Sequence, residues 1–371
     1  MLIWGCCWFN EDVDCVIQFI NNSLESLNKY NFDTIPVVFV ANTGISEDDI
    51  NYLKENVKGV VILRNNYDLY PNKNYGVYSI VSYSYAKKSD YVAIVDPDWN
   101  IVDFDNYMET VLKSLIDKEC DIIIPNIGNA SGRSNILVGK SALELFYKDY
   151  SNDIKSAFPG SVFGLTNSLY KIVSSNDYHF DWGGEWDLLS YAIKNNYRVL
   201  SKDVNVINVR HRNNKSKIND SFQIWRAVFS NSDIKSRYIK SIPNSYNHRL
   251  LPLLNNFSSI DGIISVLEKQ ELSKTERQLL YMVLYPIKSI IDGKEYKFII
   301  NEESNEPYDK KEIFDVFELG LYCLNTILNK NIINRMIDNT KRISDGFFGP
   351  WTQDNKQIVV QDMQEQIKRY I

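Results

Sequence analysis

The chain has 371 residues, of which 44% are hydrophobic and 24% are charged, and its formal net charge is −6. This is the composition of a globular protein with apolar material for about two domains, and the negative charge argues against a general nucleic-acid coat, though not against a local basic site. The five cysteines contain no C-x-x-C pair, which disfavours zinc and a disulfide framework and favours a reducing compartment.

The first nine residues are apolar but have no basic flank, so we expect a strand there and not a signal peptide. No apolar run in the sequence approaches the roughly 18 residues that a membrane helix needs. A cytoplasmic location is the resulting expectation.

The first hundred residues alternate between strand and helix patterns. Short apolar runs predict strands at 2–9, 36–40, 59–63 and 91–95. Apolar residues at helical spacing predict helices at 13–27, 50–57 and 75–86. Strands separated by helices favour parallel pairing through right-handed crossovers, with ligands beyond the carboxyl ends of the strands. We therefore predict an α/β, Rossmann-like, mostly parallel sheet.

The remaining elements change character along the chain. Up to about residue 220 the patterns predict helices at 108–115, 139–150 and 169–173, strands at 121–125 and 204–209, and a strand pair at 158–164. A Gly/Asn/Ser-rich loop is predicted at 126–135, and its composition suits a segment that covers a substrate. Beyond it, amphipathic patterns predict helices at 260–267, 273–290, 311–328 and 332–343, with a capping box formed by Ser273 and Glu276. We predict two domains, at 1–220 and 221–371.

Two carboxylates one residue apart, Asp96 and Asp98, follow the predicted strand at 91–95. Pro97 restricts the backbone between them, which holds both acids on a stiff turn. Oxygen ligands of this kind suit Mg²⁺ or Mn²⁺. An ordinary Asp-Pro turn explains the same residues, but polar residues also follow the other three strands, at the same predicted edge. This context favours a divalent-cation site.

The segment 182–187 combines glycines with aromatic and acidic residues. Gly183 and Gly184 let the backbone bend and approach a ligand. Glu185 and Asp187 open a predicted helix, where the helix dipole favours acids even without function. The functional interpretation is an acceptor site in which aromatic faces pack on a sugar and either carboxylate is a candidate general base. The predicted acceptor-binding residues are Trp182, Gly183, Gly184, Glu185 and Trp186.

Residues 210–249 carry nine basic side chains against two acidic ones, a local charge of about +7. A solvated charged face explains such a run, and a phosphate-handling loop is the sharper interpretation. His211 follows a predicted strand and is a candidate nitrogen ligand for the metal, although a lone histidine is more often a surface residue. Arg210 and Arg212 beside it are candidate diphosphate contacts.

The order of these motifs resembles the nucleotide-binding half of GT-A glycosyltransferases, in particular those of family 2. The matching segments run from Trp8 to Glu11, Val40 to Gly44, Lys73 to Gly76 and Ile94 to Asp98. The Trp-Gly-Gly-Glu segment is similar to one in galactosyl- and N-acetylgalactosaminyltransferases, and its spacing and the helical tail resemble the mannosylglycerate synthases. The resemblance covers about residues 1–215 and implies a GT-A domain followed by a helical C-terminal subdomain.

By position, the resemblance implies that Asp98, Asp96 and His211 hold the metal and that Glu185 or Asp187 binds the acceptor and takes its proton. The residues that it implies for nucleotide binding are Phe9, Asn10, Glu11, Asn42, Lys73, Asn74 and Asp96. The sequence departs from the family at Asn42, where an Asp is usual, and at Trp186, where galactosyltransferases have the acidic residue that acts as base. The identity of the base and the anomeric outcome therefore stay open.

We predict a metal-dependent glycosyltransferase that moves a hexose or pentose from a UDP- or GDP-sugar to an acceptor hydroxyl, with Mn²⁺ or Mg²⁺ as cofactor. The basic stretch suggests an anionic acceptor, such as a phosphorylated small molecule, an acidic glycan or a lipid. A hydroxylated nucleic-acid base is less favoured, because no nucleic-acid module is recognisable. A sugar-phosphate nucleotidyltransferase is a second hypothesis, disfavoured by the absence of glycine from 9–12. A non-catalytic carbohydrate-binding protein is the third.

Overall fold

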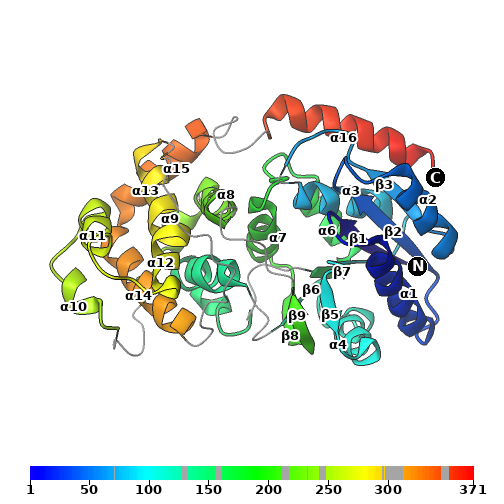
Figure 1. Ribbon diagram of the computed structural model, residues 1–371, viewed down its shortest axis with the longest axis horizontal. Coiled ribbons are helices and arrows are strands. Elements are labelled where there is room, and N and C mark those ends of the chain that lie inside the picture. Colours follow the sequence, from blue (N-terminus) through cyan, green and yellow to red (C-terminus); the bar gives the residue numbers. More distant parts are fainter. Residues whose placement is uncertain are drawn as a thin grey trace. The chain divides into compact units, whose positions relative to one another are not determined.

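The computed structural model describes residues 1–70, 72–127, 132–154, 161–209, 217–231, 233–241, 248–294, 296, 312–343 and 351–371. The chain forms two compact units (Figure 1). Unit 1 comprises 1–130, 159–210 and 349–371, and unit 2 comprises 131–158 and 211–348. The units therefore divide the chain differently from the boundary predicted at 220, because 131–158 joins the helical unit and the C-terminal segment returns to unit 1.

Unit 1 is built on a seven-stranded sheet with the order β3-β2-β1-β4-β7-β6-β8. Its strands are β1 (Leu2–Trp8), β2 (Thr34–Val40), β3 (Val61–Arg64), β4 (Tyr91–Val95), β6 (Ile122–Asn126), β7 (Ser161–Leu165) and β8 (Val199–Asp203). β7 pairs antiparallel with β4 and β6, whereas the other neighbours pair parallel. The predicted mostly parallel α/β sheet is thus confirmed. β5 (Trp99–Ile101) and β9 (Val206–Val209) form a separate antiparallel pair.

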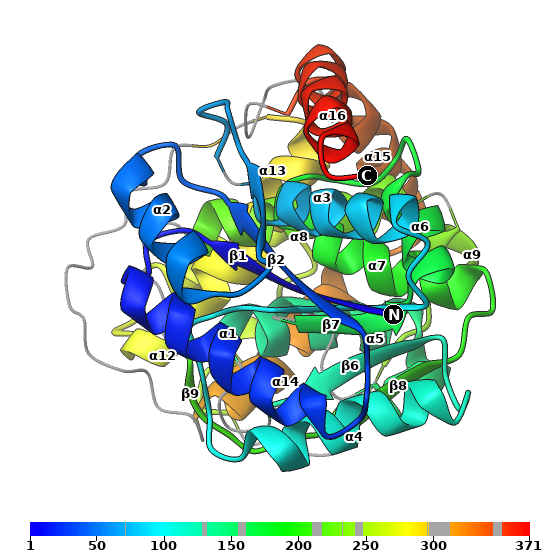
Figure 2. The same ribbon diagram turned by 90° about the vertical axis from the view of Figure 1, so that its right-hand side faces the viewer.

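The central strands are apolar throughout because helices cover both faces of the sheet. All seven residues of β1 are buried. One face is covered by α1 (Val13–Asn28), α2 (Glu47–Asn56) and α4 (Phe104–Ile116), and the other by α3 (Lys73–Ala86), α6 (Thr166–Val173) and α7 (Gly183–Lys194) (Figure 2). Side-chain caps from Asp12, Ser46 and Asp103 fix the starts of α1, α2 and α4.

A helix that the sequence patterns did not predict, α16 (Gln353–Lys368), packs on α3 and β3 (Figure 1). The Gln366 side chain accepts from the backbone N–H of Arg64 and donates to its carbonyl, both at 2.9 Å. These bonds satisfy backbone groups on the edge strand β3, which would otherwise offer a pairing surface to another chain. α16 therefore covers part of the β3 edge of the sheet in unit 1.

The described part of unit 2 is helical. Its elements are η2 (Asn135–Lys140), α5 (Ser141–Phe146), η3 (Lys148–Tyr150), α8 (Lys217–Ser230), α9 (Ile234–Arg237), α10 (Leu251–Leu254), α11 (Ile260–Leu267), α12 (Lys274–Leu279), η5 (Leu280–Leu284), α13 (Tyr285–Asp292), α14 (Glu312–Ile327) and α15 (Lys330–Ile343). Trp225 of α8 is fully buried and donates its indole N–H to the Met282 carbonyl at 3.0 Å. The predicted helical subdomain and the capping box of Ser273 and Glu276 are confirmed.

Two local predictions differ from the structure in their bounds. The described part of the strand pair predicted at 158–164 belongs to one strand, β7, and 158–160 lie outside the described residues. The helix predicted at 139–150 is present, but it begins earlier, with a π-helical turn at 135–140, and its α-helical part ends at Phe146. Residues 128–131 of the predicted covering loop also lie outside the described residues. Among the helices of the described ranges, none has both the length and the apolarity to cross a membrane.

Candidate active site

The connectivity of the sheet identifies a binding edge in unit 1. From β1 the chain proceeds outward to β2 and β3 on one side, and β4 lies against the opposite side of β1. Ligands bind outside the carboxyl ends of parallel strands at such a switch point. Phe9 directly follows β1 and Asp96 directly follows β4. Both residues predicted for this edge are therefore located there.

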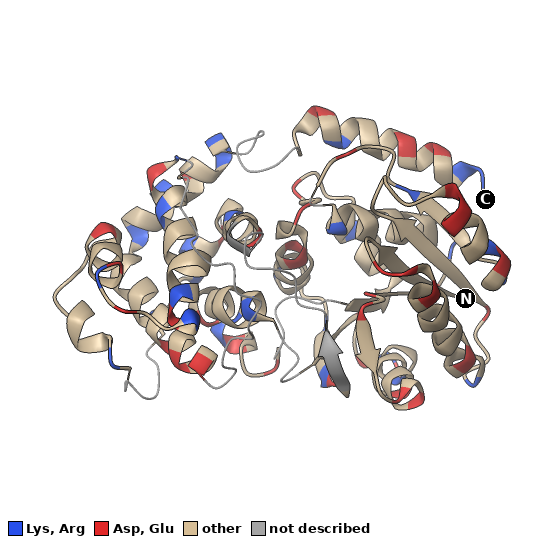
Figure 3. Cartoon of the chain, in the orientation of Figure 1, with Lys and Arg blue, Asp and Glu red and all other residues tan. Residues whose placement is uncertain are grey.

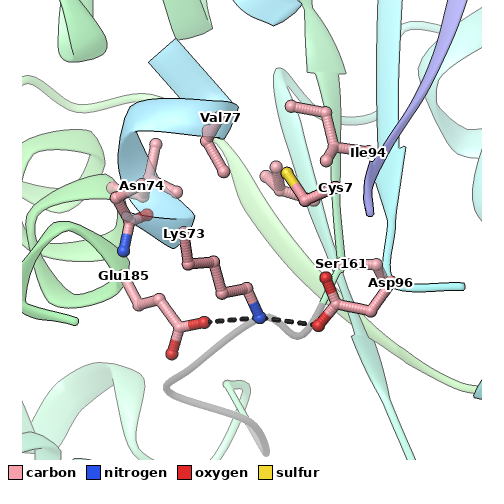
Figure 4. A pocket seen from close by; sticks show the side chains of 10 residues that line it. Cys7, Lys73, Asn74, Val77, Ile94, Asp96, Ser161 and Glu185 are labelled. Atoms are coloured by element: carbon pink, nitrogen blue, oxygen red, sulfur yellow. Dashed lines mark hydrogen bonds and ion pairs between the residues drawn. The ribbon is translucent and has the colours of Figure 1, made fainter. Parts of the chain in front are cut away.

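A small pocket lies at this edge, with side chains from β1, β4, β7, α3 and α7 around it (Figure 4). Its lining residues are Cys7, Lys73, Asn74, Val77, Ile94, Asp96, Ser161, Val162, Glu185 and Leu188. The free volume is about 10 Å³, which is room for about one water molecule. One wall of the pocket is apolar, and the charged side chains of Lys73, Asp96 and Glu185 lie at the opposite end (Figure 4).

Lys73 is the central charge of the pocket. Its Nζ lies 2.7 Å from Asp96 Oδ2 and 3.0 Å from Glu185 Oε1 (Figure 4). The side chains of Lys73, Asp96 and Glu185 are only 16%, 22% and 7% exposed. Burial lowers the pKa of Lys73, but the ion pairs with Asp96 and Glu185 outweigh burial and raise that pKa above its ordinary value. Lys73 is therefore a permanent cation between two carboxylates.

The two candidate bases, Glu185 and Asp187, have different surroundings. Glu185 lines the pocket beside Lys73. The Asp187 carboxylate accepts from the backbone N–H of His179 at 2.7 Å and lies 2.8 Å from His179 Nδ1. Among the described residues, the pocket lining includes Glu185 but not Asp187. Asp187 thus holds the preceding loop, whereas Glu185 faces the pocket.

The loop before α7 is fixed against α3 by Asn74, which is fully buried. Its amide donates to the Asp181 carbonyl at 2.6 Å and accepts from the Tyr178 hydroxyl at 3.0 Å. A Cβ on Gly184 would lie 2.2 Å from the His179 carbonyl oxygen and 2.6 Å from Asn74. Gly184 is therefore required for backbone packing. Asn74, which we predicted as a nucleotide contact, is engaged in holding this loop.

The polar residues after β1 and β2 form a second cluster at the same edge. Asn42 donates to the Asn10 side chain at 2.7 Å, which joins the two strand ends. The Glu11 carboxylate accepts the backbone N–H groups of Phe9 and Asn10 at 2.9 and 3.1 Å. The ring of Phe9 lies 5.4 Å from that of Tyr70. The structure brings the predicted nucleotide residues Phe9, Asn10, Glu11 and Asn42 together.

The predicted metal residues are described only in part. Asp96 and Asp98 flank the turn at Pro97, whereas His211 lies outside the described residues. In the described ranges no group of three or more His, Cys, Asp or Glu side chains is arranged to hold a metal. Two carboxylates still fit a hard cation, because Mg²⁺ is commonly bound by one or two carboxylates with water and substrate phosphates in its other positions.

The acceptor-motif tryptophans also differ in exposure. Trp186 is fully buried within the core of unit 1, so its faces pack against protein. Trp182 is partly buried, and the Lys73 ammonium lies 5.3 Å from its ring centroid. An aromatic face beside a cation stabilises that cation's position by roughly 0.5–2 kcal/mol. Of the two tryptophans, Trp182 is therefore the one at the charged end of the pocket.

The predicted diphosphate contacts, Arg210 and Arg212, lie outside the described residues. Further along the basic stretch, Arg226 is buried and Arg249 pairs with Glu276 of α12. Figure 3 shows the basic residues of unit 2 spread over several helices, with acidic residues among them. The described part of the stretch is thus integrated into the helical unit and does not form one basic loop.

Three residues near the site were not singled out from the sequence. Ser161, at the start of β7, lines the pocket and lies 3.3 Å from the Tyr107 hydroxyl. Tyr70 pairs with Phe9. His179 pairs with Asp187. The antiparallel direction of β7, which places Ser161 at the pocket, has no local sequence signature.

Comparison with known proteins gives one informative result. No model of a protein family matches the sequence, and no curated protein gives a significant match. Solved structures of glucosyl-3-phosphoglycerate synthase from Mycobacterium tuberculosis are similar. The complex with Mn²⁺, uridine-diphosphate-glucose and phosphoglyceric acid matches with a TM-score of 0.50 and 15% identity over 62% of this chain and 79% of the other. The complex with phosphoglyceric acid gives 0.49 and 16% over the same shares.

The chain has the GT-A fold. The predicted fold class is thereby confirmed, including the mostly parallel sheet and the helical extension. In this fold the candidate pocket occupies the position expected from the sheet alone, at the carboxyl ends of β1 and β4.

Proposed function

We propose that the protein is a metal-dependent glycosyltransferase that moves a sugar from a UDP- or GDP-sugar to the hydroxyl of an anionic acceptor. The observation that carries this proposal is the meeting of Asp96, Lys73 and Glu185 in one pocket at the switch point of a GT-A sheet. Removing three charged side chains from water costs desolvation free energy, which is offset only where the charges pair with one another. Clusters of buried charges in a cleft are also typical of functional sites.

The donor side of the site would be formed by the ends of β1, β2 and β4. Phe9, Asn10 and Asn42 would contact the base and ribose, and Tyr70 adds an aromatic face beside Phe9. Asp96 and Asp98 would hold Mn²⁺ or Mg²⁺, which supplies charge neutralisation for the diphosphate leaving group when it is bound. Lys73 supplies a second positive charge from the protein itself, and its ammonium is a point donor suited to phosphate oxygens.

The acceptor side would be formed by Glu185 and Trp182. Glu185 lines the pocket, and its carboxylate is the group that can accept a proton from an acceptor hydroxyl, so we assign it as the candidate general base. Asp187 would act indirectly, by fixing His179 and the loop that leads to Glu185. This assignment makes Trp182 a contact for the acceptor and leaves Trp186 in the core.

An anionic acceptor was suggested by the sequence of residues 210–249, which has nine basic and two acidic side chains. In the described part of that stretch, Arg226 is buried and Arg249 pairs with Glu276, so the support for an anionic acceptor comes from the structural comparison. The similar solved structure was obtained with phosphoglyceric acid, a phosphorylated carboxylic acid. We therefore propose a phosphorylated small molecule as the first acceptor class to test.

The nucleotidyltransferase hypothesis is less compatible with the loop after β1. Such enzymes cradle phosphates with free backbone N–H groups of a glycine-rich loop. Here the N–H groups of Phe9 and Asn10 are taken by the carboxylate of Glu11 at 2.9 and 3.1 Å. The negative charge of Glu11 at this position would also repel a phosphate.

The direct test is a transfer assay. Wild-type protein would be incubated with Mn²⁺, each of a panel of UDP- and GDP-sugars, and phosphorylated hydroxy acids, and products would be resolved by mass spectrometry. We expect release of nucleoside diphosphate with one sugar added to the acceptor. Glu185→Gln should lower turnover by about 10²–10⁴-fold with little change in donor binding, whereas the matched variant Asp187→Asn should retain more turnover. The absence of transfer and of nucleotide-sugar hydrolysis across the panel would contradict the proposal.

A further inference from the structure

The pocket contains one cation for two carboxylates. Lys73 begins α3, Asp96 directly follows β4, and Glu185 lies in the first turn of α7, so three separate parts of the fold position the three charges. Lys73 Nζ contacts both carboxylates, at 2.7 and 3.0 Å. The same ammonium thus links the acid assigned to the donor side with the acid assigned to the acceptor side.

This arrangement conflicts with the tasks proposed for both acids. A carboxylate paired with Lys73 binds a divalent cation less well, because the ammonium repels that cation and occupies an oxygen. A carboxylate paired with Lys73 also has one oxygen occupied by the ammonium, at 2.7 Å in Asp96 and 3.0 Å in Glu185, so that oxygen is not available to another ligand. In the geometry of the free protein, Asp96 and Glu185 are both held by the side chain of Lys73.

Lys73 has the properties of a group that can move between partners. Its flexible four-carbon stem carries a point charge with three donors, unlike the rigid planar fork of an arginine. Its side chain is 16% exposed, so part of it is in contact with solvent. The next residue, Asn74, is fixed by hydrogen bonds of 2.6 and 3.0 Å. The backbone at the start of α3 is therefore anchored while the Lys73 side chain remains adjustable.

We propose that Lys73 is an exchangeable counter-ion that couples binding of the divalent cation to binding of the nucleotide. In the free protein the Lys73 ammonium contacts Asp96 and Glu185. When a nucleoside diphosphate enters, the Lys73 ammonium transfers to the diphosphate oxygens and releases Asp96 for the divalent cation. The donor nucleotide and the metal therefore bind together. This inference rests on the proposed function for the identity of the ligand.

The test measures binding of Mn²⁺ alone, from the electron paramagnetic resonance signal of the free ion, with and without UDP or GDP. Wild-type protein should bind Mn²⁺ weakly without nucleotide and more tightly with it. Lys73→Met should bind Mn²⁺ without nucleotide about tenfold more tightly than wild type, because a repelling charge beside Asp96 is gone. Glu185→Gln should bind Mn²⁺ no more tightly than wild type, since Lys73 still holds Asp96.

Lys29→Met, which removes the exposed pair with Asp105, is the matched control and should leave Mn²⁺ binding unchanged. Equal or weaker Mn²⁺ binding by Lys73→Met overturns the proposal. If thermal melting shows that Lys73→Met does not fold, the double variant Lys73→Met/Glu185→Gln replaces it, because Asp96 is then the remaining charge of the three. The double variant should also bind Mn²⁺ about tenfold more tightly than wild type without nucleotide.

The two proposals fail in different ways. If wild-type protein binds neither UDP nor GDP with Mn²⁺, the proposed function is wrong. Tighter Mn²⁺ binding by Lys73→Met would then still support competition between Lys73 and the cation, and unchanged binding would overturn it.

Discussion

Gly184→Ala tests whether the glycines at the start of α7 allow the backbone packing that positions Glu185. A Cβ there would lie 2.2 Å from the His179 carbonyl oxygen and 2.6 Å from Asn74, far inside normal contact distance. Neither neighbour can swing away, since one is backbone and the other is fixed by two hydrogen bonds. Overpacking of this kind costs about 1–3 kcal/mol, and the helix preference of alanine returns up to about 1 kcal/mol. The distance of 2.2 Å places this site at the upper end of that cost, so we expect a net destabilisation of about 2 kcal/mol.

The assay is urea unfolding followed by tryptophan fluorescence, which reports mainly on unit 1 because six of the seven tryptophans lie there. The matched control is Gly320→Ala in α14, where a Cβ would meet only the flexible end of Leu279 at 3.2 Å. It should be neutral or stabilising by up to about 1 kcal/mol. An unfolding midpoint for Gly184→Ala equal to or above that of wild type would refute the packing argument.

Three further outcomes are expected. Asp98→Asn should keep the wild-type melting temperature but lose the rise in melting temperature that Mn²⁺ with UDP or GDP gives the wild type. A rise equal to that of the wild type would show that Asp98 is not a metal ligand. Trp351→Ala should cost about 3–5 kcal/mol, measured by circular dichroism, because its ring packs 5.3 Å from Phe180; a loss below about 1 kcal/mol would contradict this. Burial lowers the pKa of His248, whose Nδ1 accepts the Leu250 N–H at 3.3 Å. A depressed histidine pKa means stability is full above the ordinary value of 6.5 and declines as pH falls through it. His248→Asn should flatten that decline, and an unchanged pH profile would exclude His248.

Much of the sheet was predictable because its strands are apolar on both faces. The strand predicted at 91–95 matches β4, and the strands at 2–9 and 36–40 match β1 and β2 within two residues. The direction and the partners of β7 were not predicted, because they depend on the rest of the sheet and not on local pattern. β5 has three residues, too few to carry a periodic signal.

Long-range packing was the part that the sequence could not reveal. No helix or strand was predicted for residues 351–371. In the structure, Trp351 packs on Tyr75 and Phe180, and Lys356 donates to the Tyr178 carbonyl at 2.8 Å. These contacts join residues about 170–280 positions apart, and no local spacing encodes them. Two of these contacts, to Tyr178 and Phe180, support the loop that precedes α7 and Glu185.

The sequence allowed the residues of the candidate site to be predicted, but not their arrangement in space. Asp96, Lys73 and Glu185 were each named from a motif, but their convergence on one ammonium required the structure. The sequence also did not reveal the pairing of His179 with Asp187, because the bend at 180–181 and the first turns of α7 bring residues eight positions apart to 2.8 Å. That contact favours Glu185 over Asp187 as the candidate base.

The most direct test of the account is a crystal structure of the protein with Mn²⁺ and UDP or GDP, using the anomalous signal of manganese to locate the ion. The account predicts manganese bonded to Asp98 or Asp96 and to the diphosphate, with the nucleotide beyond the carboxyl ends of β1 and β4. Manganese elsewhere, or a nucleotide bound away from this edge of the sheet, would contradict it.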